Sequence, residues 1–544
     1  MAILMFYLLC GRKVRSAPVW ALATVFVMSL YLRSELYQLA AMRGLEEMDG
    51  LFVRDAYRTT DNEIRFVYFK NTQFRNHLKF FDGAKWRVVA ERRVDPLMRL
   101  FLRCQFEAHL AVVRFENQSD ASTLWLTSEI AKEKYPIRVK DVRQPATFSS
   151  TFDYTHKLGV CLQPIYFHAD WTLFVQYFEF WIASGATKFY IYLHSSTKQV
   201  REVLDFYKRK LGDNMEIIPW SDLPVAAVDR GDFHADPNTR VFRVGIHGAI
   251  NDCLLRARYQ VKFLSMLDLD ETLQVPVGNT VVGELDSLSV DFPRMGTISL
   301  QWLYAEHQND NAEARYPSEI SFASFKEIRR PLESLVNGVY RDFRKVIQRP
   351  ERVALTDIHS TLVNELLDAE FYLNSVPEGA ISVVANAITD IARFQGEGRD
   401  LRTSPYRYWE QRVPTGRMAV VHLRRFNPTP ASNKKPLYSN DTTTFWSFLH
   451  VAQFMHNGYT MRLKDDTFAN YDTGEWQQTV ENTMRTLEEC RYYPFNHKQT
   501  IGKGACQSIA NCEPLISDKH QFLRVDQVWR NVAHRGKIVQ YVKN

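Results

Sequence analysis

Residues 261–271 read Val-Lys-Phe-Leu-Ser-Met-Leu-Asp-Leu-Asp-Glu, a mostly apolar run of strand length that ends in carboxylates. Side chains two apart on a strand point to the same face. Asp268 and Asp270 are therefore predicted to project together where a buried strand opens into a loop. Two carboxylates at such an edge suit Mg²⁺ or Mn²⁺, which take oxygen ligands and leave positions open for phosphates. A solvated acidic turn explains the same four residues equally well, so their surroundings have to decide.

The segments before this run alternate between strand and helix patterns. Strands are expected at 159–167, 188–194 and 215–220, and helices at 171–182, 200–211 and 242–259. Gly185 and Gly212 are expected to end the first two helices, and 195–197 to cap the start of the second. This order predicts a mostly parallel sheet with right-handed crossovers, in which ligands bind at the carboxyl ends of strands. Asp268 and Asp270 follow such an end, which favours a binding site.

Further strands are expected after the acidic turn, at 295–302, 344–350 and 417–425, the last of which carries His422. A polar loop separates the first two of them. Asp441 is expected to cap a helix over 445–456 in the C-terminal tail.

The composition is that of a globular protein with more than one folded unit. The chain has 544 residues, of which 45% are hydrophobic and 24% charged. Its net charge of +6 is spread over 68 basic and 62 acidic residues. This balance, with no long basic run, argues against nucleic acid as a partner.

The N-terminus has the pattern of a membrane anchor. Residues 17–32 carry no charge and follow a cluster of three basic residues. The run is shorter than the usual span of about 20 residues. The basic cluster predicts a cytosolic tail over 1–16, an anchor over 17–32 and a lumenal remainder that starts with a stem over 33–62. Residues 1–10 are also mostly apolar, which makes this topology less clean. A cleaved signal peptide is the alternative, but no small-x-small cleavage site directly follows the apolar run.

The lumenal part begins with residues 63–150, whose short alternating runs predict a β-rich accessory domain. Six cysteines lie beyond the anchor, an even number that permits three disulfides in an oxidising lumen. Their pairing cannot be derived from sequence. Two glycosylation sequons, at Asn117 and Asn440, are consistent with the same location.

An ordered series of short motifs resembles glycosyltransferase family 92. These motifs are Cys161-Leu-Gln-Pro164, Phe180-Trp-Ile-Ala-Ser-Gly-Ala186, Asn251-Asp-Cys-Leu-Leu-Arg256, Leu267-Asp-Leu-Asp-Glu271, Lys345-Val-Ile-Gln-Arg-Pro-Glu351 and Val421-His-Leu-Arg424. The resemblance implies a GT-A-like α/β domain, assigned to 155–428, with a helical, cysteine-containing extension over 429–544. It also implies a Golgi type II membrane enzyme that transfers galactose from UDP-galactose with inversion and depends on a metal. In one member of the family the acceptor is a fucose of N-glycan cores.

The resemblance directs the expected chemistry to the acidic turn. A UDP-sugar donor leaves as a diphosphate, whose charge Mn²⁺ or Mg²⁺ would neutralise. We expect Asp270 to bind the metal, Asp268 to bind metal or ribose, and His422 to be a third ligand, with a core histidine as the alternative. Glu271 is expected to cap the turn.

Other candidates surround the turn. Tyr192 and His194 end the second strand, where uridine would lie. Asp252 and Arg256 are four apart on a helix and so either contact the nucleotide or form an ion pair. Arg349 and His359 are candidates for diphosphate or acceptor contacts. Inversion also needs a base on the acceptor side, for which the candidates are Glu306 and Asp310.

Two other classes of function stay open at the level of sequence. A non-catalytic glycan-binding or scaffolding protein on the same fold is the main alternative. A hydrolase with paired carboxylates is the least favoured, because nothing supplies a matching acid and base environment. The donor sugar, the acceptor, the linkage and the oligomeric state cannot be derived from the sequence.

Overall fold

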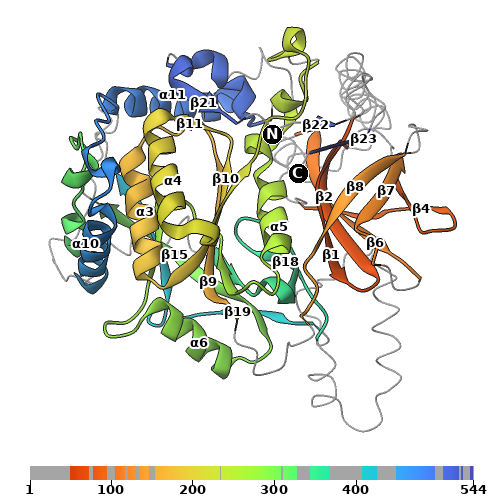
Figure 1. Ribbon diagram of the computed structural model, residues 1–544, viewed down its shortest axis with the longest axis horizontal. Helices are drawn as coiled ribbons and strands as arrows, with labels where there is room; N and C mark the ends of the chain where they lie inside the picture. Colours follow the sequence, from red (N-terminus) through yellow and green to blue (C-terminus); the bar gives the residue numbers. More distant parts are fainter. Residues whose placement is uncertain are drawn as a thin grey trace, which may run out of the picture.

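The computed structural model describes residues 50–72, 77–94, 104–116, 120–128, 134–145, 154–232, 235–307, 310–327, 344–367, 407–425, 449–496, 506–516, 518–525, 529–530 and 539–542. They form a mixed α/β protein in which a β-rich N-terminal part lies beside a larger sheet flanked by helices (Figure 1).

The larger sheet begins with four parallel strands in the order β12-β10-β9-β13. Their bounds are β9 His156–Ile165, β10 Ala186–Leu193, β12 Met215–Pro219 and β13 Val261–Ser265. These strands lie close to the predicted ranges, because their buried runs of apolar residues were long enough to stand out.

The other half of this sheet is mixed, so the predicted mostly parallel arrangement holds for only part of it. β16 (Arg344–Gln348) runs antiparallel to both β13 and β15 (Met295–His307). β20 (Ala419–Arg425) and β19 (Trp409–Arg412) are parallel to β15, and β14 (Glu271–Gln274) is antiparallel to β20. The alternating direction brings the start of β16 to the edge where β13 ends.

Helices cover both faces of the four parallel strands (Figure 1). α3 (Trp171–Ala183) and α4 (Lys198–Leu211) lie on one face, and α5 (Ile246–Arg256) lies on the other. The Asp170 side chain caps α3 by accepting the N–H groups of Thr172 and Leu173. Gly185 and Gly212 end α3 and α4 with positive φ, as predicted.

One local prediction about these helices holds only in part, and one was wrong. Thr197 is the N-cap residue of α4, as expected, but its side chain caps no N–H group, and residues Ser195–Thr197 form the short strand β11. α5 starts at Ile246 because Arg243, Val244 and Gly245 all adopt positive φ and interrupt the helix. The apolar spacing over 242–246 gave no sign of this break.

The N-terminal sheet has the strand order β4-β3-β7-β8-β1-β2-β6-β5. Its strands are β1 Leu51–Thr60, β2 Glu63–Asn71, β3 Leu78–Phe81, β4 Trp86–Val88, β5 Ala90–Arg93, β6 Phe106–Arg114, β7 Thr123–Ser128 and β8 Tyr135–Asp141. β1 occupies residues that the sequence placed in the stem. Charged residues masked its strand pattern: Arg54 is buried and donates to the backbone oxygen of Ser221, and the half-buried Asp55 pairs with Arg256.

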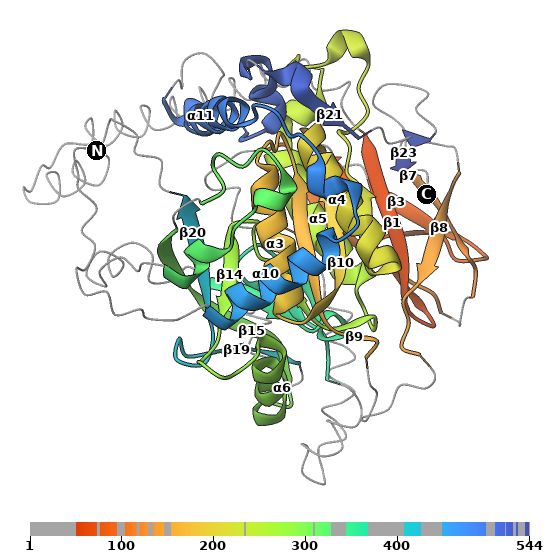
Figure 2. The ribbon, with the colours of Figure 1, turned by 60° about the vertical axis from the view of Figure 1, so that its left-hand side comes forward.

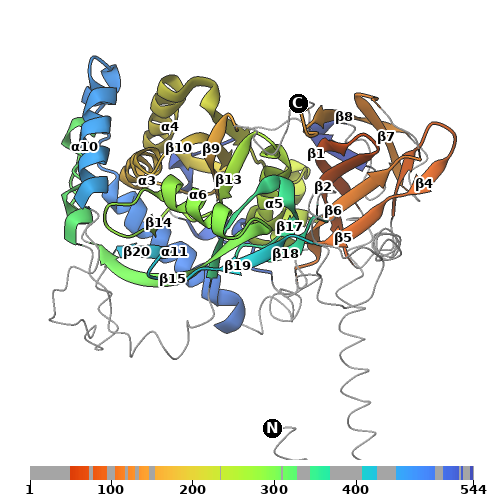
Figure 3. The same cartoon turned by 90° about the horizontal axis from the view of Figure 1, so that it is seen from below.

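α5 lies between the two sheets, and its outward face packs against the N-terminal one (Figure 3). Tyr57 of β1 donates a hydrogen bond to Asp252 of α5 at 2.8 Å, and Asp55 of β1 pairs with Arg256. The β-rich part is therefore joined to the larger unit through buried polar contacts as well as apolar ones.

The C-terminal residues return to both parts of the molecule (Figure 2). α10 (Leu449–Leu463) packs against α3, and β21 (Phe522–Arg524) pairs with β11. β22 (Trp529–Arg530) and β23 (Val539–Val542) join the N-terminal sheet, where β23 runs parallel to β1. The remaining elements are α6 Val281–Asp291, β17 Val353–Thr356, β18 Thr361–Asn364 and α11 Gln477–Asn496.

Three disulfides join the six cysteines that follow the predicted anchor. They pair Cys104 with Cys506, Cys161 with Cys253, and Cys490 with Cys512. The second fixes α5 to β9, and the first fixes the C-terminal residues to the N-terminal part. The expectation that these cysteines permit three disulfides is met.

In the part of the chain that the structure describes, no helix is long and apolar enough to cross a membrane. The predicted anchor at 17–32, the stem residues 33–49, both sequon asparagines and the proposed cap Asp441 lie outside the described residues.

Candidate active site

The order of the parallel strands marks a point where a ligand can bind. From β9 the chain adds β10 and β12 on one side and then β13 on the other, so the direction of strand addition reverses between β9 and β13. Ligands of open α/β sheets bind outside the carboxyl ends of the strands at such a reversal. Asp268 and Asp270 follow β13 at this edge, as the sequence predicted.

Two of the three predicted metal ligands are in direct contact. The Nε2 atom of His422 lies 2.8 Å from Oδ2 of Asp270. His422 stands in the middle of β20, between β14 and β15, while Asp270 immediately precedes β14. The indole of Trp302 stacks on the His422 ring with centroids 4.8 Å apart.

Glu271 links this pair to Asp268. Its Oε1 accepts the indole N–H of Trp302 at 2.8 Å, and its Oε2 accepts the backbone N–H of Asp268 at 2.8 Å. The Glu271 side chain is 1% exposed. The prediction that Glu271 fixes the acidic turn agrees with these contacts.

Lys345 completes the arrangement from the start of β16. Its ammonium lies 2.9 Å from Oδ2 of Asp268 and 3.1 Å from Oε2 of Glu271. Burial alone would raise the pKa of Asp268, but the Lys345 ammonium outweighs burial and lowers it. Burial and the neighbouring Asp268 charge raise the pKa of Glu271 to about 7. The six residues from Asp268 to His422 that make these contacts, Asp268, Asp270, Glu271, Trp302, Lys345 and His422, are called the site ring below.

The donor atoms of the site ring suit a divalent cation. Asp270 offers a carboxylate that is 39% exposed, and His422 offers an imidazole nitrogen beside it. The described residues contain no cluster of three or more His, Cys, Asp or Glu side chains arranged to hold a metal. A cation at Asp270 and His422 would therefore complete its coordination with substrate oxygens and water, as Mg²⁺ does with nucleotides.

The other predicted residues near this edge differ in how they are placed. His359 is exposed, and its Nδ1 lies 3.0 Å from the backbone oxygen of Arg344, beside Lys345. Asp310 is exposed in the loop that follows β15. The backbone of Glu306 belongs to β15, and its side chain is outside the described structure. His359 and Asp310 are thus both exposed to solvent.

Three candidates for nucleotide contact are buried away from this edge. The prediction for Tyr192 is corrected, and of the two possibilities for Asp252 and Arg256 the structure shows the ion pair. Tyr192 and Tyr57 both donate to the Asp252 carboxylate, which also pairs with Arg256 at 3.3 Å. Tyr192, Asp252 and Arg256 are at most 9% exposed. The N-terminal sheet covers this face of α5, so these residues join the two parts of the molecule.

Arg349 was also misplaced by the sequence. β16 runs antiparallel to β13, so its end lies at the edge of the sheet opposite Asp268. There Arg349 pairs with Glu351 at 2.8 Å and donates to the Tyr154 hydroxyl at 3.0 Å. It is therefore a structural ion-pair residue.

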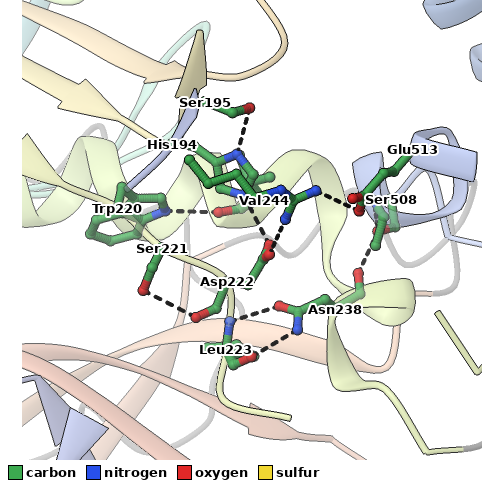
Figure 4. A network of polar contacts seen from close by, with 12 residues as sticks. His194, Ser195, Trp220, Ser221, Asp222, Leu223, Asn238, Val244, Ser508 and Glu513 are labelled. Carbon is green, nitrogen blue, oxygen red and sulfur yellow. Dashed lines mark hydrogen bonds and ion pairs between the residues drawn. The ribbon is translucent and has the colours of Figure 1, made fainter. Parts of the chain in front are cut away.

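His194 ends β10 at the correct edge, but neighbours occupy both of its ring nitrogens (Figure 4). Nδ1 lies 2.9 Å from the Ser195 hydroxyl, and Nε2 lies 2.8 Å from Oδ1 of Asp222. Asp222 also pairs with Arg524 of β21. With 2% exposure, His194 fixes the edge of the sheet and makes no open contact surface for uridine.

The same edge is covered by residues from the C-terminal part of the chain. Ser508 donates to the backbone oxygen of Asn238, and the Asn238 side chain bonds both backbone groups of Leu223 (Figure 4). A small pocket adjoins this network and is lined in part by Arg54, Asp222 and Ser508. Segments far apart in the sequence therefore build this side of the edge.

The chain matches a known family over the strands that carry most of this site. The model of glycosyltransferase family 92 matches residues 156–372. This range is therefore similar to glycosyltransferase family 92 and is called the family 92 domain below. The matched range includes Asp268, Asp270, Trp302 and Lys345, whereas His422 lies beyond it.

A curated relative supports the assignment of the family 92 domain. A glycosyltransferase family 92 protein of Caenorhabditis elegans is 21% identical over 200 residues, which is 37% of this chain and 37% of that protein. Among solved structures, an amylomaltase from Corynebacterium glutamicum covers 26% of this chain and 20% of its own at 12% identity. Its TM-score of 0.11 carries no argument about fold.

Sequence reasoning missed two members of the site ring, Lys345 and Trp302. Both lie within expected strands, and neither belongs to a motif with a known chemical role. Their contacts depend on β16 lying between β13 and β15, an order that does not follow the chain. Lys345 opens one of the motifs that resemble family 92, and this was the available signal for it.

Proposed function

We propose that this chain is a metal-dependent, inverting glycosyltransferase that transfers galactose from UDP-galactose to a glycan on a glycoprotein. The observation that supports this most is the contact between Asp270 and His422 at the carboxyl end of β13. It places a carboxylate and an imidazole from distant parts of the chain at one point of the family 92 domain. The strand order on either side of β9 is that expected for a GT-A-like nucleotide site.

In this proposal the site ring binds and orients the donor. Asp270 and His422 hold Mn²⁺ or Mg²⁺, which neutralises charge on the diphosphate leaving group. Asp268 accepts a hydroxyl of the nucleotide sugar with the oxygen that Lys345 does not hold. Glu271 and Trp302 keep both aspartates in place through the contacts described above.

Inversion further requires a base that takes the proton from the acceptor hydroxyl. Glu306 and Asp310 remain the candidates, since the segment that carries them leaves the end of β15 beside β20. His359 remains a candidate for contact with the diphosphate or the acceptor.

The activity is tested with the lumenal part of the chain, a panel of UDP-sugars and Mn²⁺, by measuring UDP release with and without glycan acceptors. We expect turnover with UDP-galactose that disappears on chelation of the metal. Asp270→Ala should abolish it with an unchanged circular dichroism spectrum. Asp205→Ala, an exposed carboxylate on α4, is the matched control and should keep full activity. Activity retained by Asp270→Ala would refute the assignment of the metal ligand.

A non-catalytic glycan-binding protein is the second candidate, and one observation favours it. Lys345 already neutralises Asp268, which leaves Asp270 and His422 as the pair of donors for a cation within the site ring. Calorimetric binding of a glycan without any binding of UDP and Mn²⁺ would support this candidate over the enzyme.

We also propose a Golgi location with a single N-terminal span and the family 92 domain in the lumen. The three disulfides favour an oxidising compartment. Protease protection of the folded domain in intact microsomes is the expected result, together with glycan modification at Asn117 or Asn440. Digestion without detergent would contradict this orientation.

A further inference from the structure

Lys345 is a buried cation in the site ring. Its side chain is only 2% exposed, although it carries an ammonium. A buried charge is stable only when partners compensate it. Asp268 and Glu271 provide that compensation at 2.9 Å and 3.1 Å.

The strand pairing fixes the place of this ammonium. Ile347 and Gln348 of β16 pair with Ser265 and Leu264 of β13, so the start of β16 lies level with the residues that follow β13. Lys345 also pairs with Leu300 of β15 on its other side. Strands on both sides hold its backbone, and its ammonium cannot follow a ligand out of the site.

The two aspartates therefore have partners of different chemistry. Asp268 is 42% exposed and shares one oxygen with an ammonium. Asp270 is 39% exposed and faces the imidazole of His422. Since their exposure is nearly equal, a cation entering the site distinguishes them by charge. It is repelled by the ammonium beside Asp268 and meets a metal-binding nitrogen beside Asp270.

We propose that Lys345 is the positioning residue that separates the roles of Asp268 and Asp270. It withholds Asp268 from the metal and leaves one oxygen of that carboxylate for a hydroxyl of the nucleotide. It also places a permanent positive charge at the edge where the anionic donor binds. This inference rests on the proposed function, because it assumes that a nucleotide and a divalent cation share the site.

The test measures binding without turnover. Mn²⁺ binding is followed by electron paramagnetic resonance in the absence of nucleotide, and UDP binding is followed by calorimetry in the absence of metal. For Lys345→Met we expect Mn²⁺ to bind about tenfold more tightly and UDP about tenfold more weakly. The variant lacks the Lys345 ammonium, which repels the metal cation and attracts the diphosphate of UDP. A residue with only a structural role would not move these two affinities in opposite directions.

Three further variants keep the test decisive. Lys345→Arg retains the charge and should bind Mn²⁺ like the wild type. Lys345→Met/Glu271→Gln removes the carboxylate that would otherwise stay buried without its cation, so it should fold and still show the tighter Mn²⁺ binding. Lys345→Met/Asp268→Asn should not bind Mn²⁺ more tightly than the wild type, because it lacks the Asp268 carboxylate that the loss of Lys345 would make available to the metal.

The outcomes separate this inference from the proposed function. If folded Lys345→Met and Lys345→Met/Glu271→Gln both bind Mn²⁺ no more tightly than the wild type, the role of Lys345 is overturned and the proposed transferase still stands. A wild-type protein that binds no Mn²⁺ overturns both.

Discussion

Glu271 connects the two halves of the site ring with a single carboxylate. It accepts the indole N–H of Trp302 on one oxygen, and the backbone N–H of Asp268 and the Lys345 ammonium on the other. Because Trp302 also stacks on His422, a change at Glu271 or Trp302 reaches both aspartates. The geometry of the candidate metal ligands thus depends on residues that do not bind the metal.

Trp302→Phe should destabilise the protein by about 1–3 kcal/mol, because it keeps a ring on His422 but leaves a buried oxygen of Glu271 unpaired. Urea unfolding followed by circular dichroism measures this difference. Trp409→Phe, at a position that is 37% exposed, is the control and should change stability little. An equal loss in the two variants would argue against the hydrogen bond to Glu271.

The sequence predicted the residues of this site better than their contacts. Asp268 and Asp270 were placed correctly because two carboxylates directly after a buried run are a local signal. His422 was found because it interrupts an apolar strand. Tyr192 was misassigned, and the choice between nucleotide contact and an ion pair stayed open for Asp252 and Arg256. The reason is that the sheet that covers them comes from residues about 200 positions earlier, which no local pattern shows.

At the scale of elements, α5 is held to the N-terminal sheet by close packing at its start. A Cβ atom on Gly248 would lie 2.4 Å from the Phe69 ring of β2, and one on Gly245 would lie 2.6 Å from the same ring. Trp220 packs against the far side of Phe69 with centroids 6.3 Å apart. The ring therefore has little room to move, and glycine is required on the helix.

Gly248→Ala should lower the free energy of unfolding by about 1–3 kcal/mol, because an added methyl group overpacks a filled core. Differential scanning calorimetry gives the change in Tm. Gly416→Ala serves as the matched control, since a Cβ atom there meets no other atom within 4 Å. Similar Tm values for the two variants would contradict the close approach of α5 and β2.

α10 provides a second connection between distant elements. Arg462 pairs with Glu179 of α3, whose side chain is fully buried and also accepts the Tyr207 hydroxyl at 2.6 Å. Arg462→Met should lower stability by about 3–5 kcal/mol, because it leaves a buried carboxylate without its cation. Arg485→Met on α11, where the side chain is exposed, should have a small effect on the same unfolding curve.

Hydrophobic periodicity identified these elements with unequal success. α3 and α4 were predicted closely because each has a clear apolar face and a glycine with positive φ at its end. The start of α5 was missed because backbone strain at Arg243 and Val244 follows from tertiary contacts, such as the Trp220 indole on the Val244 oxygen at 2.7 Å. β1 was missed because buried ion pairs gave it the composition of a stem.

At the scale of the whole molecule, buried charges join the N-terminal sheet to the family 92 domain. Arg65 of β2 and Arg258, which follows α5, both pair with Glu365. Burial alone would raise the Glu365 pKa, but the two guanidinium groups outweigh it and lower the pKa to about 2 from an ordinary 4.5. The two parts of the molecule are thus connected by a contact that needs an ionised carboxylate.

This contact predicts a defined dependence of stability on pH. The folded pKa lies below the unfolded one, so the stabilisation is complete above about pH 4.5 and is lost as the pH falls towards 2. The loss should be about 3 kcal/mol, which corresponds to the size of the pKa shift. Urea unfolding at a series of pH values measures it. In Glu365→Gln the fall in the free energy of unfolding between about pH 4.5 and pH 2 should be smaller by that amount. If the fall is as large as in the wild type, the ion pairs of Glu365 do not cause it.

The pairing of β1 with β23 has a consequence for how the protein is made. Leu51 at the start of the first described strand lies opposite Val539 near the end of the chain. At about 5–20 residues per second, the ribosome needs on the order of a minute to synthesise the residues that separate them. During that time the β1 edge that β23 later covers stays unpaired, which is the kind of surface that chaperones protect. Completion of the N-terminal sheet therefore waits until Val539 has been synthesised, and a chain shortened before Val539 should be retained as an immature protein.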